Sequence, residues 1–289
     1  MSDEKMSSVS ATKAHDRKQL RGVVLNCFGR GGSSIVWNMI ASSPDILWPG
    51  LEWHQSVFGS QHVLRKALRR VGQYIDWSRV PGLSEIAEAH VRRHIPDSQW
   101  AAKPDATAIT LKVMDYHMVF NTLIEQRFTP TTHIILTRHP LPMIEGLIRG
   151  GMEEARAIRW YNDVSALMST CQKSHDALVV KFEDMAATPE KLAMRLFEQL
   201  GVRPPLDGCI RLKVKKFGAE RTAENSLAIG DYIQCPYGEL SQRIDPDVNR
   251  KAVARLDVDM AERIYAATAD AASVFGYNRN NFYNGKDTT

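Results

Sequence analysis

The chain has 289 residues, a length that fits one large α/β domain as well as two smaller ones. Its 44% hydrophobic and 24% charged residues are close to globular averages, which excludes global disorder, collagen and coiled-coil rods. The 37 basic and 33 acidic residues leave a net charge of +4, which favours an anionic small molecule or a glycan over nucleic acid, because nucleic acid needs a dense basic face.

The sequence predicts a cytoplasmic protein with a disordered leader over residues 1–20, which are polar and aperiodic. No apolar run approaches the ~18 residues of a membrane-spanning helix, and the N-terminus lacks the apolar region of a signal peptide. We therefore expect no integral membrane segment. Four scattered cysteines without a CxxC pair predict free thiols: Cys27, Cys171, Cys209 and Cys235.

A glycine-rich turn, Gly29–Ser34, follows the apolar run 21–28 and precedes a helical pattern that begins at Ile35. Strand, glycine loop and helix is the order in which α/β proteins build a phosphate cradle, although a plain tight turn has the same composition. The turn lacks the lysine and spacing of a Walker A loop, and the strand at 133–137 does not end in an aspartate. The loop therefore suits one phosphate without a metal ion.

Strands and helices alternate along the rest of the chain. The predicted strands are 108–113, 133–137 and 177–181, and the predicted helices lie within 56–95, after 113 through Gln126, and over 141–149, 153–174, 188–200 and 258–274. Residues 202–245 are rich in loops. This alternation predicts an α/β fold of one domain over 21–280, with a P-loop-like central parallel sheet flanked by helices and a tail at 281–289.

Two of the predicted helices have an apolar face, and one predicted helical region is rich in basic residues. The buried faces are predicted to be Leu192, Leu196, Phe197 and Leu200 in one helix, with Thr188 as its cap and Gly201 as its stop, and Met260, Ile264, Ala267, Ala271 and Val274 in the last helix. The basic run is Arg65, Lys66, Arg69, Arg70, Arg79, Arg92 and Arg93. It indicates either a solvated helix face or an acidic or amphiphilic partner.

Arg138 directly follows the predicted strand 133–137 and precedes a new helix. Ligands of open parallel sheets bind outside the carboxyl ends of the strands, so Arg138 and the Gly29 loop face one crevice if their strands are neighbours. Two anion sites on one edge indicate a ligand with two phosphate-like groups. A surface arginine is the alternative.

Four stretches in chain order resemble the sulfotransferases that depend on 3′-phosphoadenosine 5′-phosphosulfate. Residues 28–35 with 43–46 resemble their 5′-phosphosulfate loop, 134–143 their 3′-phosphate motif, 179–201 their valine-arginine-tyrosine-glutamate-aspartate stretch, and 274–277 their closing glycine-tyrosine. The resemblance implies a sulfotransferase domain that moves a sulfuryl group from this donor, without a metal, to a hydroxyl or an amine of a glycan, lipid or small molecule.

The resemblance also implies roles at matching positions. Arg30 would hold the phosphosulfate and offset charge on the departing 5′-phosphate, and Arg138 would bind the 3′-phosphate. The residues that would wrap the 5′-phosphate are Gly31, Gly32, Ser33 and Ser34. The family's serine eight residues after the arginine is Gly146 here, so a second hydroxyl for the 3′-phosphate is missing.

The resemblance also implies a residue that acts as the base and activates the acceptor, located after the first helix. Residues 48–54 resemble carbohydrate sulfotransferases, which implies Glu52 as the base and His54 as its orienting partner. Lys112 would direct its charge at the transferring sulfuryl group, and His117 is the rival base. The alternatives to a sulfotransferase are a P-loop-type nucleotide kinase and a degenerate protein that binds nucleotide or glycan without catalysis.

Overall fold

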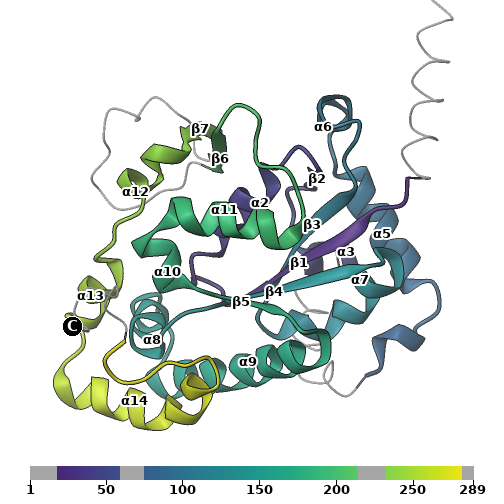
Figure 1. Cartoon of the computed structure of the whole chain (residues 1–289). Coiled ribbons are helices and arrows are strands. Elements are labelled where there is room, and N and C mark those ends of the chain that lie inside the picture. The colour runs from purple at the N-terminus through teal and green to yellow at the C-terminus, as the bar shows by residue number, and fades with distance from the viewer. Residues whose placement is uncertain (1–17, 59–74, 214–231, 282–289) are drawn as a thin grey trace, which may run out of the picture.

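A five-stranded parallel sheet forms the centre of the computed structural model, which describes residues 18–58, 75–213 and 232–281 (Figure 1). The strands lie in the order β2-β3-β1-β4-β5, and each neighbouring pair is parallel. Their bounds are β1 Arg21–Cys27, β2 Ile46–Leu47, β3 Ala108–Met114, β4 Thr131–Thr137 and β5 Leu178–Lys181. The predicted α/β class and parallel sheet are confirmed, and the two-residue strand β2 is an addition.

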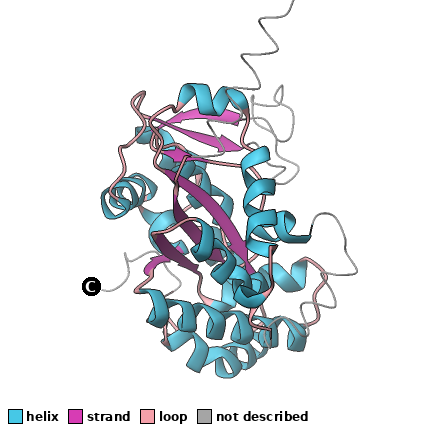
Figure 2. Cartoon of the chain, turned by 90° about the vertical axis from the view of Figure 1, so that its right-hand side faces the viewer, coloured by secondary structure: helices cyan, strands magenta, loops and turns pink. Residues whose placement is uncertain are grey.

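Helices cover both faces of the sheet, as Figure 2 shows for the sheet seen from the side. Their bounds are α2 Ser33–Ala41, α3 Trp53–Phe58, α5 Leu83–Arg93, α6 Asp97–Ala102, α7 Asn121–Arg127, α8 Pro140–Arg149, α9 Glu154–His175, α10 Phe182–Ala187, α11 Pro189–Leu200, α12 Leu240–Arg243, α13 Val248–Val253 and α14 Val258–Ser273. Three short 3₁₀ turns are Trp77–Arg79, Asp115–Phe120 and Tyr237–Glu239. The chain forms a single α/β domain.

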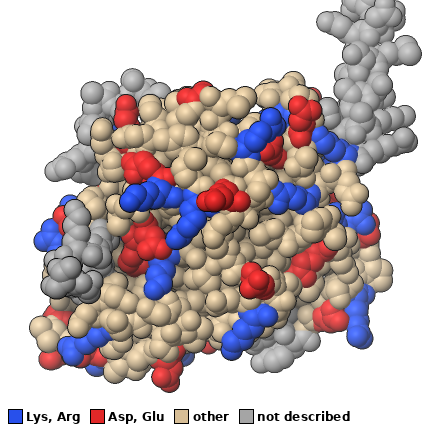
Figure 3. Space-filling view, in the orientation of Figure 1, with Lys and Arg blue, Asp and Glu red and all other residues tan. Residues whose placement is uncertain are grey.

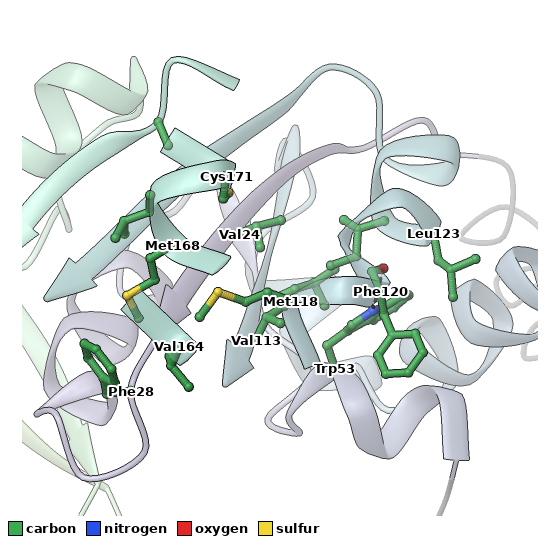
Figure 4. Close-up of a cluster of buried hydrophobic side chains, with 14 of the residues drawn as sticks. Val24, Phe28, Trp53, Val113, Met118, Phe120, Leu123, Val164, Met168 and Cys171 are labelled. Carbon is green, nitrogen blue, oxygen red and sulfur yellow. Dashed lines mark hydrogen bonds between the residues drawn. The ribbon is translucent and has the colours of Figure 1, made fainter. Parts of the chain in front are cut away.

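Alternate residues of β1 bury their side chains on opposite faces, as the period of two in a strand requires. Val24 joins the core under α7, α8, α9 and α14, whereas Val23 and Leu25 join the core under α2, α10 and α11. Figure 4 shows the first of these cores, in which Phe28 and Val24 lie among side chains from α9 and the turn after β3. Phe28 stacks on Tyr161 with ring centroids 5.1 Å apart, which anchors the residue before the glycine loop.

The region predicted to be loop-rich contains a β-hairpin. Strands β6 (Cys209–Lys213) and β7 (Tyr232–Pro236) pair antiparallel, and Ile210 and Cys235 are fully buried in the core beside α2. The prediction missed both strands because each is only five residues long and they lie far apart in the sequence. All four cysteines are free, as predicted.

The stripe predicted for α11 is buried, and Gly201 ends the helix in the left-handed conformation with φ of 60°. Thr188 is the N-cap residue, but its hydroxyl donates to the carbonyl of Asp184 in the first turn of α10 and makes no cap hydrogen bond to α11. The stripe predicted for α14 is wrong in part, because Ile264, Thr268 and Ala272 are buried at four-residue spacing while Ala267 and Val274 are exposed. The hydroxyl of Thr268 donates to the Ile264 carbonyl, which lets a polar residue occupy the buried face.

The basic run does not form one solvated face. Arg92 pairs with Glu88 at 2.8 Å and donates to the Lys18 carbonyl, and only 9% of its side chain is exposed. Arg79 and Arg93 are exposed as predicted, and Arg65, Lys66, Arg69 and Arg70 lie outside the described residues. On the face shown in Figure 3, basic and acidic side chains lie side by side.

No helix among the described residues is long and apolar enough to cross a membrane. The predicted leader and the tail lie almost wholly outside the described residues, which begin at Lys18 and end at Asn281.

The strand order decides which segments share a sheet edge. Strand β1 lies between β3 and β4, so the carboxyl ends of all three strands open on the same side. The Gly29 loop, Asp115 and Arg138 follow these three ends. They therefore lie together at one edge of the sheet, and the hydrogen bonds from Gly29 to Asp115 and from Arg138 to the Arg30 carbonyl join them.

Candidate active site

The backbone of the Gly29 loop accommodates only glycine at one position. Gly32 has φ of +80°, and a Cβ atom there would lie 2.4 Å from Cε2 of Phe182. Gly32 is also the N-cap of α2 and has no side chain to satisfy the first helical amides, which begin at Ser33 and Ser34. These amides and the positive end of the helix dipole form a site for an anion.

Asp115 holds the loop from the neighbouring strand. Its carboxylate accepts a hydrogen bond of 2.8 Å from the amide of Gly29, and Asp115 itself has a positive φ of 55°. The left-handed conformation turns the chain directly after β3 and brings the carboxylate back toward β1. Asp115 was missed in the sequence, although an acidic residue just after a predicted strand is a signal that could have identified it.

Arg30 is exposed and has φ of 66°, a conformation that is uncommon for a residue other than glycine. Its guanidinium carbon lies 3.4 Å from the position that a Cβ atom on Gly150 would occupy. Gly150 follows α8, so the absence of a side chain there leaves room for the arginine. The loop thus presents an exposed cation at this edge of the sheet.

Arg138 lies under the loop, and only 8% of its surface is exposed. Its Nε and Nη2 atoms donate to Oδ1 of Asn249 at 2.9 and 2.6 Å, and Nη1 donates to the carbonyl of Arg30 at 3.3 Å. The guanidinium also lies 4.1 Å from the ring centroid of Phe182. Burial lowers the pKa of Arg138 to about 10, so the group is charged at neutral pH.

The buried carboxylate of Glu183 connects the segments around His139 and Tyr277, which belong to two of the motifs identified in the sequence. Glu183 accepts hydrogen bonds from the His139 amide at 3.1 Å, from Nδ2 of Asn249 at 2.7 Å and from the hydroxyl of Tyr277 at 2.7 Å. Burial raises the pKa of Glu183 although its hydrogen-bond partners and Arg138 lower it, and burial lowers the pKa of His139 to about 4. This network fixes the orientation of Asn249 and, through it, Arg138.

Glu52 and Lys112 meet on the other side of the loop. Nζ of Lys112 lies 2.9 Å from Oε1 of Glu52, and the two residues also pair through the backbone as an isolated parallel bridge. The ammonium lies 5.0 Å from the ring centroid of Trp37 in α2, and only 7% of the Lys112 side chain is exposed. Lys112 therefore does not point into solvent.

Two histidines complete this group. Nδ1 of His54 lies 3.7 Å from Oε2 of Glu52, and the His54 ring stacks on the ring of His117 with centroids 4.2 Å apart. Nδ1 of His117 in turn lies 2.9 Å from the Met114 carbonyl. The four candidates for proton transfer and charge stabilisation thus form one cluster, drawn from two segments about sixty residues apart.

Cys27 ends β1, directly before the phosphate loop. Burial raises the pKa of the Cys27 thiol to about 12, although Lys112 and the hydroxyl of Ser33 act to lower it. The thiol stays protonated and is not a nucleophile.

Gly146 lies within α8, and no atom would come within 4 Å of a Cβ atom placed on it. Close packing therefore does not explain the glycine at this position. A serine side chain fits the space without displacing a neighbour.

Three further residues of the site were not predicted from the sequence: Gly150, Phe182 and Asn249. Phe182 packs against both Gly32 and Arg138, and its place directly before Glu183 in a recognised motif was an available signal. Asn249 lies in a short helix after a loop-rich segment, and no pattern in the sequence distinguishes it.

These features define a P-loop-like α/β domain whose loop, arginines and carboxylate lie at one edge of the sheet. Within that class, the chain has the sulfotransferase fold. It is similar to the sulfotransferase domain of the olefin synthase of Synechococcus PCC 7002, with a TM-score of 0.53 and 19% identity over 91% of this chain and 97% of that one.

Two further solved structures are similar to the chain at lower scores. The sulfotransferase STF9 from Mycobacterium avium has a TM-score of 0.49 and 10% identity over 94% of this chain and 81% of that one. A sulfotransferase from Alicyclobacillus acidocaldarius has a TM-score of 0.47 and 13% identity over 88% and 94%. No protein-family model and no curated protein matches the sequence.

Proposed function

We propose that the protein is a sulfotransferase that moves the sulfuryl group of 3′-phosphoadenosine 5′-phosphosulfate to a hydroxyl, or to an amine, of an acceptor. The observation that carries this proposal is the ion pair between Glu52 and Lys112 beside the Gly29 loop. The pair would supply a proton acceptor and a buried cation at the anion site, on a sulfotransferase fold whose phosphate loop lacks the Walker A lysine of a nucleotide kinase.

The donor site is assigned residue by residue. The amides of Gly31, Gly32, Ser33 and Ser34 surround the 5′-phosphate, and the exposed guanidinium of Arg30 reaches its sulfated side. Arg138 faces the 3′-phosphate from below the loop, with Gly146 in open space nearby on α8. A guanidinium has five N–H donors, so the contacts of Arg138 with Asn249 and Arg30 leave donors for an anion.

The reaction is an in-line displacement at sulfur. The acceptor oxygen forms a bond to sulfur as its proton passes to the carboxylate of Glu52, and the bond between sulfur and the bridging phosphate oxygen breaks. The leaving group is 3′-phosphoadenosine 5′-phosphate. Lys112 and Arg30 stabilise the negative charge that develops on the sulfuryl and phosphate oxygens, and preorganised cations of this kind give the largest rate effects.

His54 orients Glu52, since its Nδ1 lies on the side of the carboxylate opposite Lys112 at 3.7 Å from Oε2. His117 is the rival base, because it stacks on His54 in the same cluster. The acceptor is a small molecule, a lipid or a glycan. We place its binding site beside Glu52, where the carboxylate is 23% exposed.

Calorimetric titration tests the donor assignment. We expect 3′-phosphoadenosine 5′-phosphate to bind with one site and ATP with Mg²⁺ to bind far more weakly. Preference for ATP with Mg²⁺ would support a kinase and overturn the proposal. Radiolabelled donor incubated with a pool of acceptors then separates an enzyme from a protein that binds nucleotide without catalysis.

The change Arg138→Ala should selectively weaken the binding of 3′-phosphorylated nucleotides. A hydrogen bond to a charged group contributes about 1.5–3 kcal/mol, so the affinity for 3′-phosphoadenosine 5′-phosphate should fall roughly 10- to 100-fold while that for adenosine 5′-phosphosulfate changes little. The ratio of the two affinities is the readout, because loss of a buried cation beside Glu183 also lowers stability. Equal losses for both ligands would remove Arg138 from the 3′-phosphate.

The change Gly146→Ser should raise both donor affinity and thermal stability. The side chain has open space, the new hydroxyl adds one hydrogen bond of roughly 1.5–3 kcal/mol to the 3′-phosphate, and serine costs about 0.5 kcal/mol less than glycine inside a helix. Calorimetry and melting temperature on the variant measure the two effects. A stabilised variant with unchanged affinity would show that Gly146 does not face the phosphate.

A further inference from the structure

Three potential metal ligands come together from α7, β4 and α9. They are Glu125 in α7, His133 in β4 and His175, the last residue of α9. One ligand atom of each lies within 4.8 Å of the others. Nε2 of His133 is 3.1 Å and Nε2 of His175 is 3.4 Å from the same carboxylate oxygen, Oε1 of Glu125.

Two of these atoms are buried without a hydrogen bond. Nε2 of His133 and Oε1 of Glu125 are close, but their contact lacks hydrogen-bond geometry, and neither atom has a hydrogen-bond partner among the described residues. His133 is only 1% exposed. Buried polar atoms without partners are rare because each costs free energy, and a bound ion is one way in which a protein satisfies them.

We infer that Glu125, His133 and His175 bind a divalent transition metal ion of the zinc class. Two imidazole nitrogens and one carboxylate oxygen are the ligand types that Zn²⁺ prefers. Two ligand atoms that are each about 2.1 Å from a tetrahedral zinc ion lie about 3.4 Å apart, and the two measured separations are close to this value. The fourth position is open to water, since about a third of the His175 side chain is exposed.

The surroundings of His133 suit a ligand that keeps its proton on Nδ1. Nδ1 lies 3.2 Å from Nδ2 of Asn26, and Oδ1 of Asn26 accepts a hydrogen bond of 2.9 Å from Asn121. A half-turn of both side-chain amides reverses the polarity of these contacts, so that Nδ1–H donates to Oδ1 of Asn26. The Nε2 lone pair is then left for the metal, and such a partner fixes the ring of a metal-binding histidine.

The site is separate from the proposed sulfuryl transfer. His133 pairs with Val24 in the middle of β1, whereas the phosphate loop begins after Cys27. The ion would join α7, β4 and α9, and it would stabilise their packing without contacting the donor. No metal is expected from the sequence because the cysteines are scattered, and this site uses no cysteine.

Calorimetric titration of the metal-free full chain with Zn²⁺, together with the visible absorption of the Co²⁺ form, tests the inference. We expect one tight site, a tetrahedral Co²⁺ spectrum and a higher melting temperature with Zn²⁺ than with chelator. His175→Ala and Glu125→Gln should each lower the Zn²⁺ affinity by at least about tenfold and remove the Co²⁺ spectrum. His175 lies at a helix end and is partly exposed, so its replacement does not threaten the fold.

His94→Ala is the matched control. His94 is an exposed histidine in contact with a second histidine, His90, with ring centroids 4.3 Å apart. It should leave the tight site and the Co²⁺ spectrum unchanged. Equal Zn²⁺ affinity in His175→Ala, Glu125→Gln and the unmodified chain would overturn the inference, as would loss of the tight site in His94→Ala alone.

Discussion

Glu52→Gln should lower turnover by roughly 10²–10⁴-fold while leaving the affinity for 3′-phosphoadenosine 5′-phosphate unchanged. Glutamine keeps the shape of the side chain, and its carbonyl oxygen still accepts a hydrogen bond from Lys112, which lies 2.9 Å from Oε1. It cannot take the proton of the acceptor. The acidic decline in the pH–rate profile should therefore disappear with the base.

The matched control is Glu85→Gln, which neutralises an exposed glutamate of α5 that pairs with Arg127. Its turnover should equal that of the unmodified chain. His117→Ala separates the two candidate bases, because the proposed mechanism predicts a smaller loss in this variant and a retained acidic decline. If His117→Ala abolishes that decline and Glu52→Gln does not, His117 is the base.

Arg30→Ala should lower the turnover rate far more than it lowers the affinity for the desulfated nucleotide. The guanidinium is most useful when charge moves onto the departing 5′-phosphate, and removal of one preorganised donor costs about 2.7–4 kcal/mol, or roughly 10²–10³ in rate. Alanine takes up the same positive φ with the same strain as arginine, so the backbone of the loop adds little to the difference.

Arg149→Ala serves as the comparison for Arg30, because Arg149 is an exposed arginine next to Gly150 that pairs with Glu145. We expect normal turnover in this variant. Arg30→Lys keeps the charge and should recover part of the rate. Unchanged turnover in Arg30→Ala would mean that the loop only starts the helix α2.

The order of strands and helices could be predicted from the sequence because each strand is a compact apolar run closed by a turn. β1, β3, β4 and β5 are each predicted to within about two residues at either end, and α8, α9 and α11 follow the helical period. The β6–β7 hairpin could not be predicted, because its strands pair with each other across a long insertion. The prediction of the buried face of α14 is partly wrong, because Thr268 can be buried there with its hydroxyl hydrogen-bonded within the helix.

Most residues of the candidate site were identified from the sequence, but Asp115, Gly150, Phe182 and Asn249 were not, and the contacts among the site residues could not be predicted. Glu52 and Lys112 meet because Glu52 follows β2, which lies next to β3, and the strand order is not readable from local pattern. Arg138 was predicted at the correct sheet edge, yet its burial under the loop depends on Asn249, which lies in an unpatterned segment 111 residues away. Long-range partners of this kind require the fold.

A crystal structure with bound 3′-phosphoadenosine 5′-phosphate tests the central claim most directly. We expect the 5′-phosphate on the amides of Gly31–Ser34 beside Arg30, the 3′-phosphate within hydrogen-bond distance of Arg138, and an open path from the 5′-phosphate to Glu52 and Lys112. A nucleotide bound elsewhere, or a 5′-phosphate that faces away from Glu52 and Lys112, would contradict the proposed function.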